Sequence, residues 1–233
     1  MYFLVNDERR FFMGWSAKAA CTSIKMWFCC VSDIRAYRKN VHSVLGYGHN
    51  KWTDLHSRKP ETFQDYRKYI IIRNPYARLV SGYVDVYVKN LRSRKPWKTF
   101  SDFVHALEND NKFKAVDRHH FVPQTGEYFK KINDSVKKWD RVVCCTDLNS
   151  QIIEINKEIG VDCHLLIHNA TFDKRFSQTP IPAYSMSDKE ILRYKPSFPC
   201  FYNEELSRVV EKVYASDFDF FSSQGFHYSS KDM

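Results

Sequence analysis

A loop near the N-terminus combines a lysine, two hydroxyl side chains and the start of a helix. The run 14–25 (GWSAKAACTSIK) joins a short apolar segment to a stretch with helical spacing. Backbone N–H groups can converge on an anion at such a junction, where Lys18 adds charge and Thr22 and Ser23 add hydroxyl donors. The segment predicts an anion-binding site, and the alternative is a polar turn capped by Thr22 or Ser23.

This loop is not a Walker A loop. The pattern GxxxxGK[ST] requires a second glycine and a lysine directly before Ser or Thr, and neither is present here. The difference counts against a kinase that uses ATP.

A second group of residues follows the apolar run 69–72. In the run 70–83 (IIIRNPYARLVSGY), Arg73 lies at the carboxyl end of a predicted strand and Ser81 about two turns into the next helix. A guanidinium fork matches a phosphate monoester with two hydrogen bonds, and a serine hydroxyl can add a third. Arg73 in a surface ion pair and Ser81 tolerated in a helix remain the alternative.

A third group contains a candidate general base. The polar run 117–124 (DRHHFVPQ) holds His119 and His120. Histidine has an ordinary pKa of about 6.5, so it can accept a hydroxyl proton near neutral pH. A metal site ranks lower, because adjacent side chains rarely converge on one ion and no further ligands have suitable spacing. A histidine held beside an apolar turn is the structural alternative.

Together these runs resemble the membrane-type carbohydrate sulfotransferases (sulfotransferase family 2), the group with the chondroitin, dermatan and HNK-1 enzymes. KAACTS at 18–23 resembles the family's PKVACTS loop, with Ala17 where the family usually has proline. The run 73–83 resembles VRDPFERLVSAY, and HFVPQ at 120–124 resembles HWxPQ. The runs 166–171 and 213–221 resemble a later HxN-[ST] segment and the terminal YxxDFxxF.

The resemblance implies a donor, 3′-phosphoadenosine-5′-phosphosulfate (PAPS), and a role for each matching residue. Lys18 and the loop Ala19, Ala20, Cys21, Thr22 and Ser23 would hold the 5′-phosphosulfate, with Lys18 stabilising charge on the bridging oxygen. Arg73 and Ser81 would bind the 3′-phosphate. His120 would be the catalytic base, with His119 as the alternative, and no metal would be needed. The acceptor would be a carbohydrate hydroxyl.

Two other function classes remain open at this point. An ATP-dependent enzyme on the same α/β framework would require magnesium. A non-catalytic basic protein could bind acidic glycans or nucleic acid through the stretch 89–98 (KNLRSRKPWK), with steep salt dependence. Nucleic acid ranks low as a partner.

The elements that must position these residues alternate along the chain. Apolar segments predict strands at 10–14, 68–73 and 141–145, and helical spacing or caps predict helices from Thr22, after Asn74-Pro75, and at 99–107, 147–159, 187–194 and 203–214. This order predicts an α/β fold, a P-loop-type three-layer sandwich with a central parallel sheet and a helical, loop-rich C-terminal third.

Composition is consistent with one PAPS-dependent domain over residues 1–233. The chain is 43% hydrophobic, and 36 basic against 27 acidic residues leave a net charge of +9. An apolar content of this size is sufficient for a core, and the positive charge favours anionic partners. The sequence does not predict the oligomeric state.

The seven cysteines bear on metal binding and on the compartment. The adjacent pairs at 29–30 and 144–145 lie in apolar stretches and are expected to be buried free thiols, and no zinc-site spacing occurs. Charged residues at 7–10 replace the apolar core of a signal peptide. We therefore expect a soluble protein, cytoplasmic in a microbe or virus, or in the Golgi lumen if an anchor was removed.

Overall fold

A computed structural model describes residues 1–36, 40–46, 52–53, 55–89, 96–110, 113–165 and 179–232. The chain divides into two compact units. Unit 1 is formed by Met1–Arg73 and Gln124–Asn169, and unit 2 by Asn74–Pro123 and Ala170–Met233. The chain therefore passes from one unit to the other three times, at 73–74, 123–124 and 169–170, and each unit is described by itself.

Unit 1 contains a four-stranded sheet in the order β1-β2-β3-β4. The strands are β1 (Tyr2–Asn6), β2 (Phe11–Trp15), β3 (Arg67–Ile72) and β4 (Arg141–Cys144). β2, β3 and β4 are parallel, whereas β1 pairs antiparallel with β2. The predicted α/β class is confirmed, and the sheet is mixed because a short turn after β1 brings the chain straight back.

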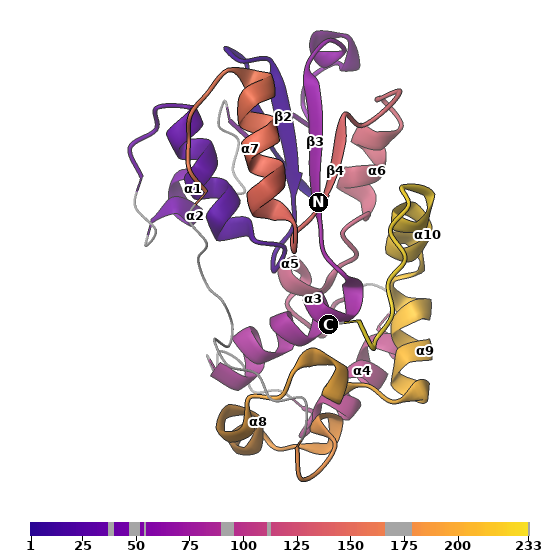
Figure 1. The fold of residues 1–233 in the computed structure, drawn as a ribbon. Coiled ribbons are helices and arrows are strands. Elements are labelled where there is room, and N and C mark those ends of the chain that lie inside the picture. Colours follow the sequence, from indigo (N-terminus) through magenta and orange to yellow (C-terminus); the bar gives the residue numbers. More distant parts are fainter. Residues whose placement is uncertain are drawn as a thin grey trace. The chain divides into compact units, whose positions relative to one another are not determined.

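Helices cover both faces of this sheet (Figure 1). α1 (Cys21–Val31) and α7 (Leu148–Ile159) lie on one face, where the indole of Trp27 donates a buried 2.9 Å hydrogen bond to the amide oxygen of Asn156. On the other face, Phe129 of α6 (Glu127–Asn133) stacks on Trp139, which packs against Phe3 and Phe12. In its described residues the unit also contains α2 (Val41–Val44) and the 3₁₀ turn η1 (Pro60–Phe63).

The strands sort their side chains between these two layers by alternation. Phe11 and Met13 of β2 pack with Tyr69 and Ile71 of β3 in the core beneath α1 and α7. The intervening residues Phe12 and Ile70 point to the opposite face, as the two-residue period of a strand requires. Parallel strands buried on both faces explain why the sequence shows continuous apolar runs here.

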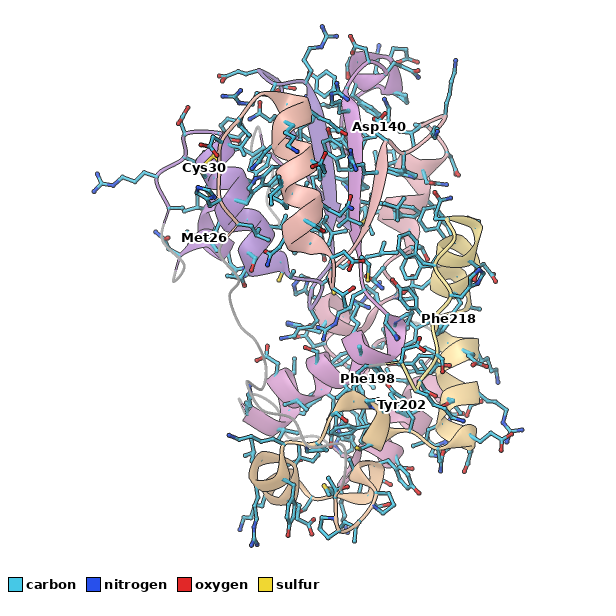
Figure 2. All side chains as sticks on the ribbon, viewed as in Figure 1. Met26, Cys30, Asp140, Phe198, Tyr202 and Phe218 are labelled. Atoms are coloured by element: carbon cyan, nitrogen blue, oxygen red, sulfur yellow. A yellow bond between two sulfur atoms is a disulfide. The ribbon has the colours of Figure 1, made fainter. Side chains whose placement is uncertain are left out.

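Unit 2 is helical in the described residues. It contains α3 (Pro75–Tyr83), a π-helical turn η2 (Val84–Lys89), α4 (Phe100–Asn109), α5 (Arg118–Phe121), η3 (Ala183–Ser185), α8 (Asp188–Tyr194), η4 (Phe198–Phe201), α9 (Glu204–Val213) and α10 (Ala215–Ser223). Its core combines aromatic and aliphatic side chains. Phe198, Tyr202 and Phe218, which are labelled in Figure 2, are partly buried and pack against this core. The prediction of a helical C-terminal third is confirmed where it is described.

Local capping signals explain where several helices begin and end. Asn74 accepts a hydrogen bond from the backbone N–H of Tyr76, with Pro75 in the first turn of α3. Thr99 and Asp102 form a capping box at α4, and Gly160 ends α7 in the left-handed conformation at φ 68°. These are the cap and stop residues that local sequence rules recognise.

The prediction of buried free thiols at 29–30 and 144–145 is wrong at Cys30, and Cys145 is a free thiol that is only partly buried. Cys30, at the end of α1 (Figure 2), forms a disulfide with Cys163, which follows α7. The partners are 133 residues apart in sequence, so only the packing of α1 beside α7 brings them together. Cys29 and Cys144 are buried free thiols as predicted. The expectation of a cytoplasmic protein drew on free thiols, and Cys30 does not support it because it is disulfide-bonded.

Within the described residues, every helix is too short or too polar to cross a bilayer.

Candidate functional site

The loop after β2 has an unusual backbone at two non-glycine positions. Lys18 has φ 64° and Ala20 has φ 55°, both in the left-handed region, and α1 begins directly after Ala20. This conformation costs a residue with a Cβ roughly 1–2 kcal/mol. Strain of this kind persists only where the surroundings impose it, and such positions are concentrated at functional sites.

The backbone of this loop gives it a chemical capability. Lys18 and Ala20 have positive φ, whereas the adjacent Ala17 and Ala19 do not. The Ala19 N–H donates to the Ser16 carbonyl at 3.2 Å, so Lys18 occupies the left-handed position of a tight turn. This turn leads directly into the N-terminus of α1, where backbone N–H groups can bind an anion. The N-cap residue of α1 is Ala20, whose side chain makes no capping hydrogen bond, and the loop residues Ala17 and Ala19 are buried. The predicted anion loop is therefore geometrically suited to a phosphate or sulfate group.

Arg73 follows β3 at the carboxyl end of the sheet. Its Nη1 donates a 2.6 Å hydrogen bond to the carbonyl oxygen of Lys18. Two residues that are 55 positions apart in sequence are thus in direct contact within unit 1. Because a guanidinium has five N–H donors, this contact leaves donor capacity for an anion. The structure brings together the cationic residues of the first and second motifs.

Gln124 holds the backbone of Arg73 in place. Its amide oxygen accepts from the Arg73 N–H at 3.1 Å, and its amide nitrogen donates to the Arg73 carbonyl at 2.8 Å. Gln124 is fully buried, so the two hydrogen bonds satisfy polar groups that burial would otherwise leave unpaired. Sequence reasoning quoted Gln124 within a motif without assigning it a role. The available signal was a polar residue at the end of an apolar turn.

The hydroxyl residues of the loop lie at the start of α1. Thr22 and Ser23 are both buried, and the Thr22 hydroxyl lies 3.0 Å from Nε2 of His42 on α2. Cys21 and the strained Ala20 are partly exposed. His42 was missed by sequence reasoning, because nothing local links residue 42 to residue 22.

Cys29 and Cys145 are poor nucleophiles. A hydrogen bond with Cys144, followed by burial, raises the pKa of the Cys145 thiol well above its ordinary value. Burial raises the pKa of Cys29 to about 11. Thiols with raised pKa values stay protonated at neutral pH and are unreactive.

In unit 2, Ser81 lies on α3 and is 5% exposed. The neighbouring motif residue Arg78 is also buried, and its guanidinium donates a 2.9 Å hydrogen bond to the carbonyl of Val122. α3 packs closely against α5, since a Cβ on Gly82 would lie 2.8 Å from a ring carbon of Phe121. Arg78 and Gly82 therefore position the segment that contains the candidate bases.

His119 and His120 lie on α5 and are half-buried, with ring centroids 4.8 Å apart. Asp117 caps this helix, and its Oδ1 lies 3.1 Å from Nδ1 of His120. The pair is at ion-pair distance although it is not aligned as a hydrogen bond. A carboxylate at Nδ1 favours a hydrogen on that nitrogen and leaves Nε2 as a proton acceptor. Asp117 is a further residue to which sequence reasoning assigned no role.

Further sequence expectations concern metal binding, the basic stretch 89–98 and the two weaker motifs at 166–171 and 213–221. Among the described residues, no group of three or more His, Cys, Asp or Glu side chains could hold a metal ion. The run 166–171 and most of the basic stretch 89–98 lie outside the described residues. The terminal run 213–221 forms the end of α9 and most of α10, where Tyr214 and Phe221 are buried.

Comparison with known proteins adds one positive finding. A family model described as "Sulfotransferase family" matches residues 1–224 of the 233-residue chain. The matched range contains the strained loop, Arg73, Ser81 and both candidate bases. No curated protein and no solved structure gave a match.

Proposed function

This chain belongs to the sulfotransferase family, and from that premise we propose that it transfers a sulfuryl group from PAPS to a carbohydrate hydroxyl. The observation that carries the proposal is the hydrogen bond from Arg73 to the Lys18 carbonyl. It joins the strained loop to the end of β3, so that Lys18 and Arg73 both lie at the carboxyl edge of the sheet, where α/β proteins bind ligands.

PAPS supplies the sulfuryl group, and the transfer does not require the protein to form a covalent bond to it. By analogy with phosphoryl transfer, the main requirements are in-line positioning and stabilisation of charge on the leaving oxygen. Preorganised N–H groups and a cation meet both requirements without reorganisation during the reaction.

Unit 1 contributes the anion-binding part of this mechanism. We assign the 5′-phosphosulfate to Lys18 and the backbone of residues 19–23, because the tight turn at Lys18 leads directly into the N-terminus of α1, where backbone N–H groups can bind an anion. Lys18 stabilises the charge that develops on the bridging oxygen. Arg73, with its backbone held by Gln124, binds the 3′-phosphate.

Unit 2 contributes Ser81 and the base. Ser81 adds a hydroxyl donor for the 3′-phosphate. His120 accepts the proton of the attacking hydroxyl at Nε2, and the carboxylate of Asp117 stabilises the imidazolium that forms. His119 is the alternative base one residue away.

We also propose that the two units belong to one sulfotransferase domain. The family match runs from residue 1 to residue 224 and crosses all three points at which the chain passes between the units. A domain boundary would instead be expected where few connections cross.

Calorimetry with the desulfated product, adenosine 3′,5′-bisphosphate (PAP), against ATP tests the function directly. We expect the protein to bind PAP in preference to ATP and without magnesium. Arg73→Ala should weaken PAP binding by about 10–100-fold, the value of a charge-assisted hydrogen bond pair. Arg73→Lys keeps the charge but loses the two-pronged guanidinium, so its PAP affinity should lie between those of the unmodified protein and Arg73→Ala.

Turnover separates binding from chemistry. Lys18→Ala should lower kcat by ~10²-fold or more, comparable with the loss of an oxyanion donor. Lys137→Ala, an exposed lysine of the same unit, is the matched control and should leave kcat unchanged. Magnesium-dependent ATP binding would favour a kinase. Binding of acidic polymers that is insensitive to Lys18→Ala would favour a non-catalytic basic protein.

A further inference from the structure

A buried lysine connects to the anion loop through a histidine. Lys25 lies on α1, one turn after Thr22, and is 0% exposed. Its Nζ lies 3.4 Å from Nδ1 of His42 and 3.9 Å from the ring centroid of Trp15. Nε2 of the same imidazole lies 3.0 Å from the Thr22 hydroxyl. The three polar groups form a continuous chain that ends at a loop hydroxyl.

Burial of this lysine is energetically unfavourable. Desolvation lowers the pKa of Lys25 to about 8, against an ordinary value of 10.5. The titratable groups beside it are the thiols of Cys21 and Cys29 and the imidazole of His42. The face of the Trp15 indole compensates in part through a cation–π contact. A methionine would fill the same volume without this cost, so the charge itself is the informative feature.

The donor and acceptor capacities of the three groups define the direction of the hydrogen bonds. A lysine ammonium has hydrogens to donate and no acceptor, so Nδ1 of His42 must accept. In a neutral imidazole the hydrogen is then on Nε2, which donates to the Thr22 oxygen. The hydroxyl hydrogen of Thr22 is therefore directed to an acceptor other than His42. An anion held by the loop is such an acceptor.

We propose that Lys25 and His42 are positioning residues that orient the Thr22 hydroxyl as a donor to the 5′-phosphosulfate. This inference rests on the proposed function for the identity of the anion. It assigns no contact with the reacting atoms to Lys25 or His42, because both act through Thr22.

The ring nitrogens of His42 test the first step without any ligand. In ¹⁵N-labelled protein at pH 7, the ¹⁵N shifts should show a hydrogen on Nε2, with the resonance assigned by its loss in His42→Gln. Lys25→Met should remove this preference. A hydrogen on Nδ1 in the unmodified protein would overturn the proposed chain of hydrogen bonds from Lys25 through His42 to Thr22.

A double-mutant cycle on PAP affinity tests the second step. Thr22→Val and His42→Phe should each weaken PAP binding by about 3–10-fold, the value of a neutral hydrogen bond. The double variant should be no weaker than Thr22→Val, because His42 acts only through the hydroxyl. Multiplying losses would show independent roles and would overturn the proposal. Thr22→Ser, which keeps the hydroxyl, should restore most of the affinity and controls for folding.

The two readouts separate this inference from the proposed function. Failure of the unmodified protein to bind PAP would overturn the function and the anion assigned to Thr22. The ¹⁵N shifts would still decide whether Lys25 sets the tautomer of His42. If His42→Phe binds PAP as tightly as the unmodified protein, the proposed function still holds, but Lys25 and His42 do not orient the Thr22 hydroxyl toward the anion.

Discussion

Two histidines in this protein have oppositely charged neighbours at the same ring nitrogen. Nδ1 of His42 in unit 1 lies 3.4 Å from the ammonium of Lys25, and Nδ1 of His120 in unit 2 lies 3.1 Å from a carboxylate oxygen of Asp117. An ammonium only donates, whereas a carboxylate only accepts. Nε2 is therefore expected to donate in His42 and to accept in His120.

This difference shows that the neighbour at one nitrogen selects the role of the other. A donating Nε2 can orient a hydroxyl but cannot take its proton, whereas an accepting Nε2 can act as a base. The neighbours also differ in how they reach the ring. Asp117 lies one helical turn before His120, whereas Lys25 meets His42 across 17 residues from a different helix. The predictions below test this contrast, beginning with the largest effect.

Replacement of the proposed base should have the largest effect. His120→Ala should lower kcat by ~10²–10⁴-fold, the usual contribution of general base catalysis, while PAP affinity stays the same. Steady-state kinetics and calorimetry on one preparation measure both quantities. Near-normal turnover would remove His120 as the base and end the contrast with His42.

The charge of Lys25 should appear in the pH dependence of stability. Its pKa falls from 10.5 to about 8 on folding, so between pH 8 and 10.5 the unfolded chain binds more protons than the folded one. The free energy of unfolding therefore rises with pH in this window, and the penalty is fully present below pH 8. Between pH 7 and pH 10, the free energy of unfolding of the unmodified protein should rise by on the order of 2 kcal/mol more than that of Lys25→Met.

Urea unfolding of both proteins at the two pH values measures this difference. Lys25→Met provides the reference because it retains the other titrating groups. A difference between the two proteins that does not change with pH would mean that Lys25 keeps its ordinary pKa, and the burial argument would be wrong.

Removal of the Asp117 charge should have a moderate effect. Asp117→Asn keeps the size of the side chain but loses the charge that stabilises the imidazolium, so kcat should fall by about 10-fold with little change in KM for PAPS. Asp219→Asn, an exposed aspartate on α10 of the same unit, is the matched control. Equal kinetics for the two variants would show that Asp117 only caps its helix.

The smallest effect is expected at the neighbouring histidine. His119→Ala should change kcat by no more than about threefold, because substitutions away from the reacting groups have small effects. A loss as large as that of His120→Ala would exchange the roles of the two residues. Steady-state kinetics of the two variants, measured in parallel, decide which histidine is the base.

Much of the framework was predictable because its signals are local. The strand predicted at 68–73 is β3 at Arg67–Ile72, and the helix expected after Asn74-Pro75 begins at Pro75 with Asn74 as its cap. Gly160 ends α7 as expected. The first strand, Tyr2–Asn6, was not predicted, since five residues offer little periodicity and its pairing with β2 is a tertiary contact.

The motifs also indicated the family, which the family match confirms, whereas the roles of the site residues remain predictions. The position of each site residue on a strand, helix or loop could be predicted from the spacing of strands, caps and polar runs. Four features depended on tertiary structure: the Arg73–Lys18 contact, the Gln124 clamp, the Cys30–Cys163 disulfide and the buried Lys25–His42 pair. Each joins residues that are 17 to 133 positions apart. Local patterns carry no record of such pairings, because packing of the core decides which distant side chains meet.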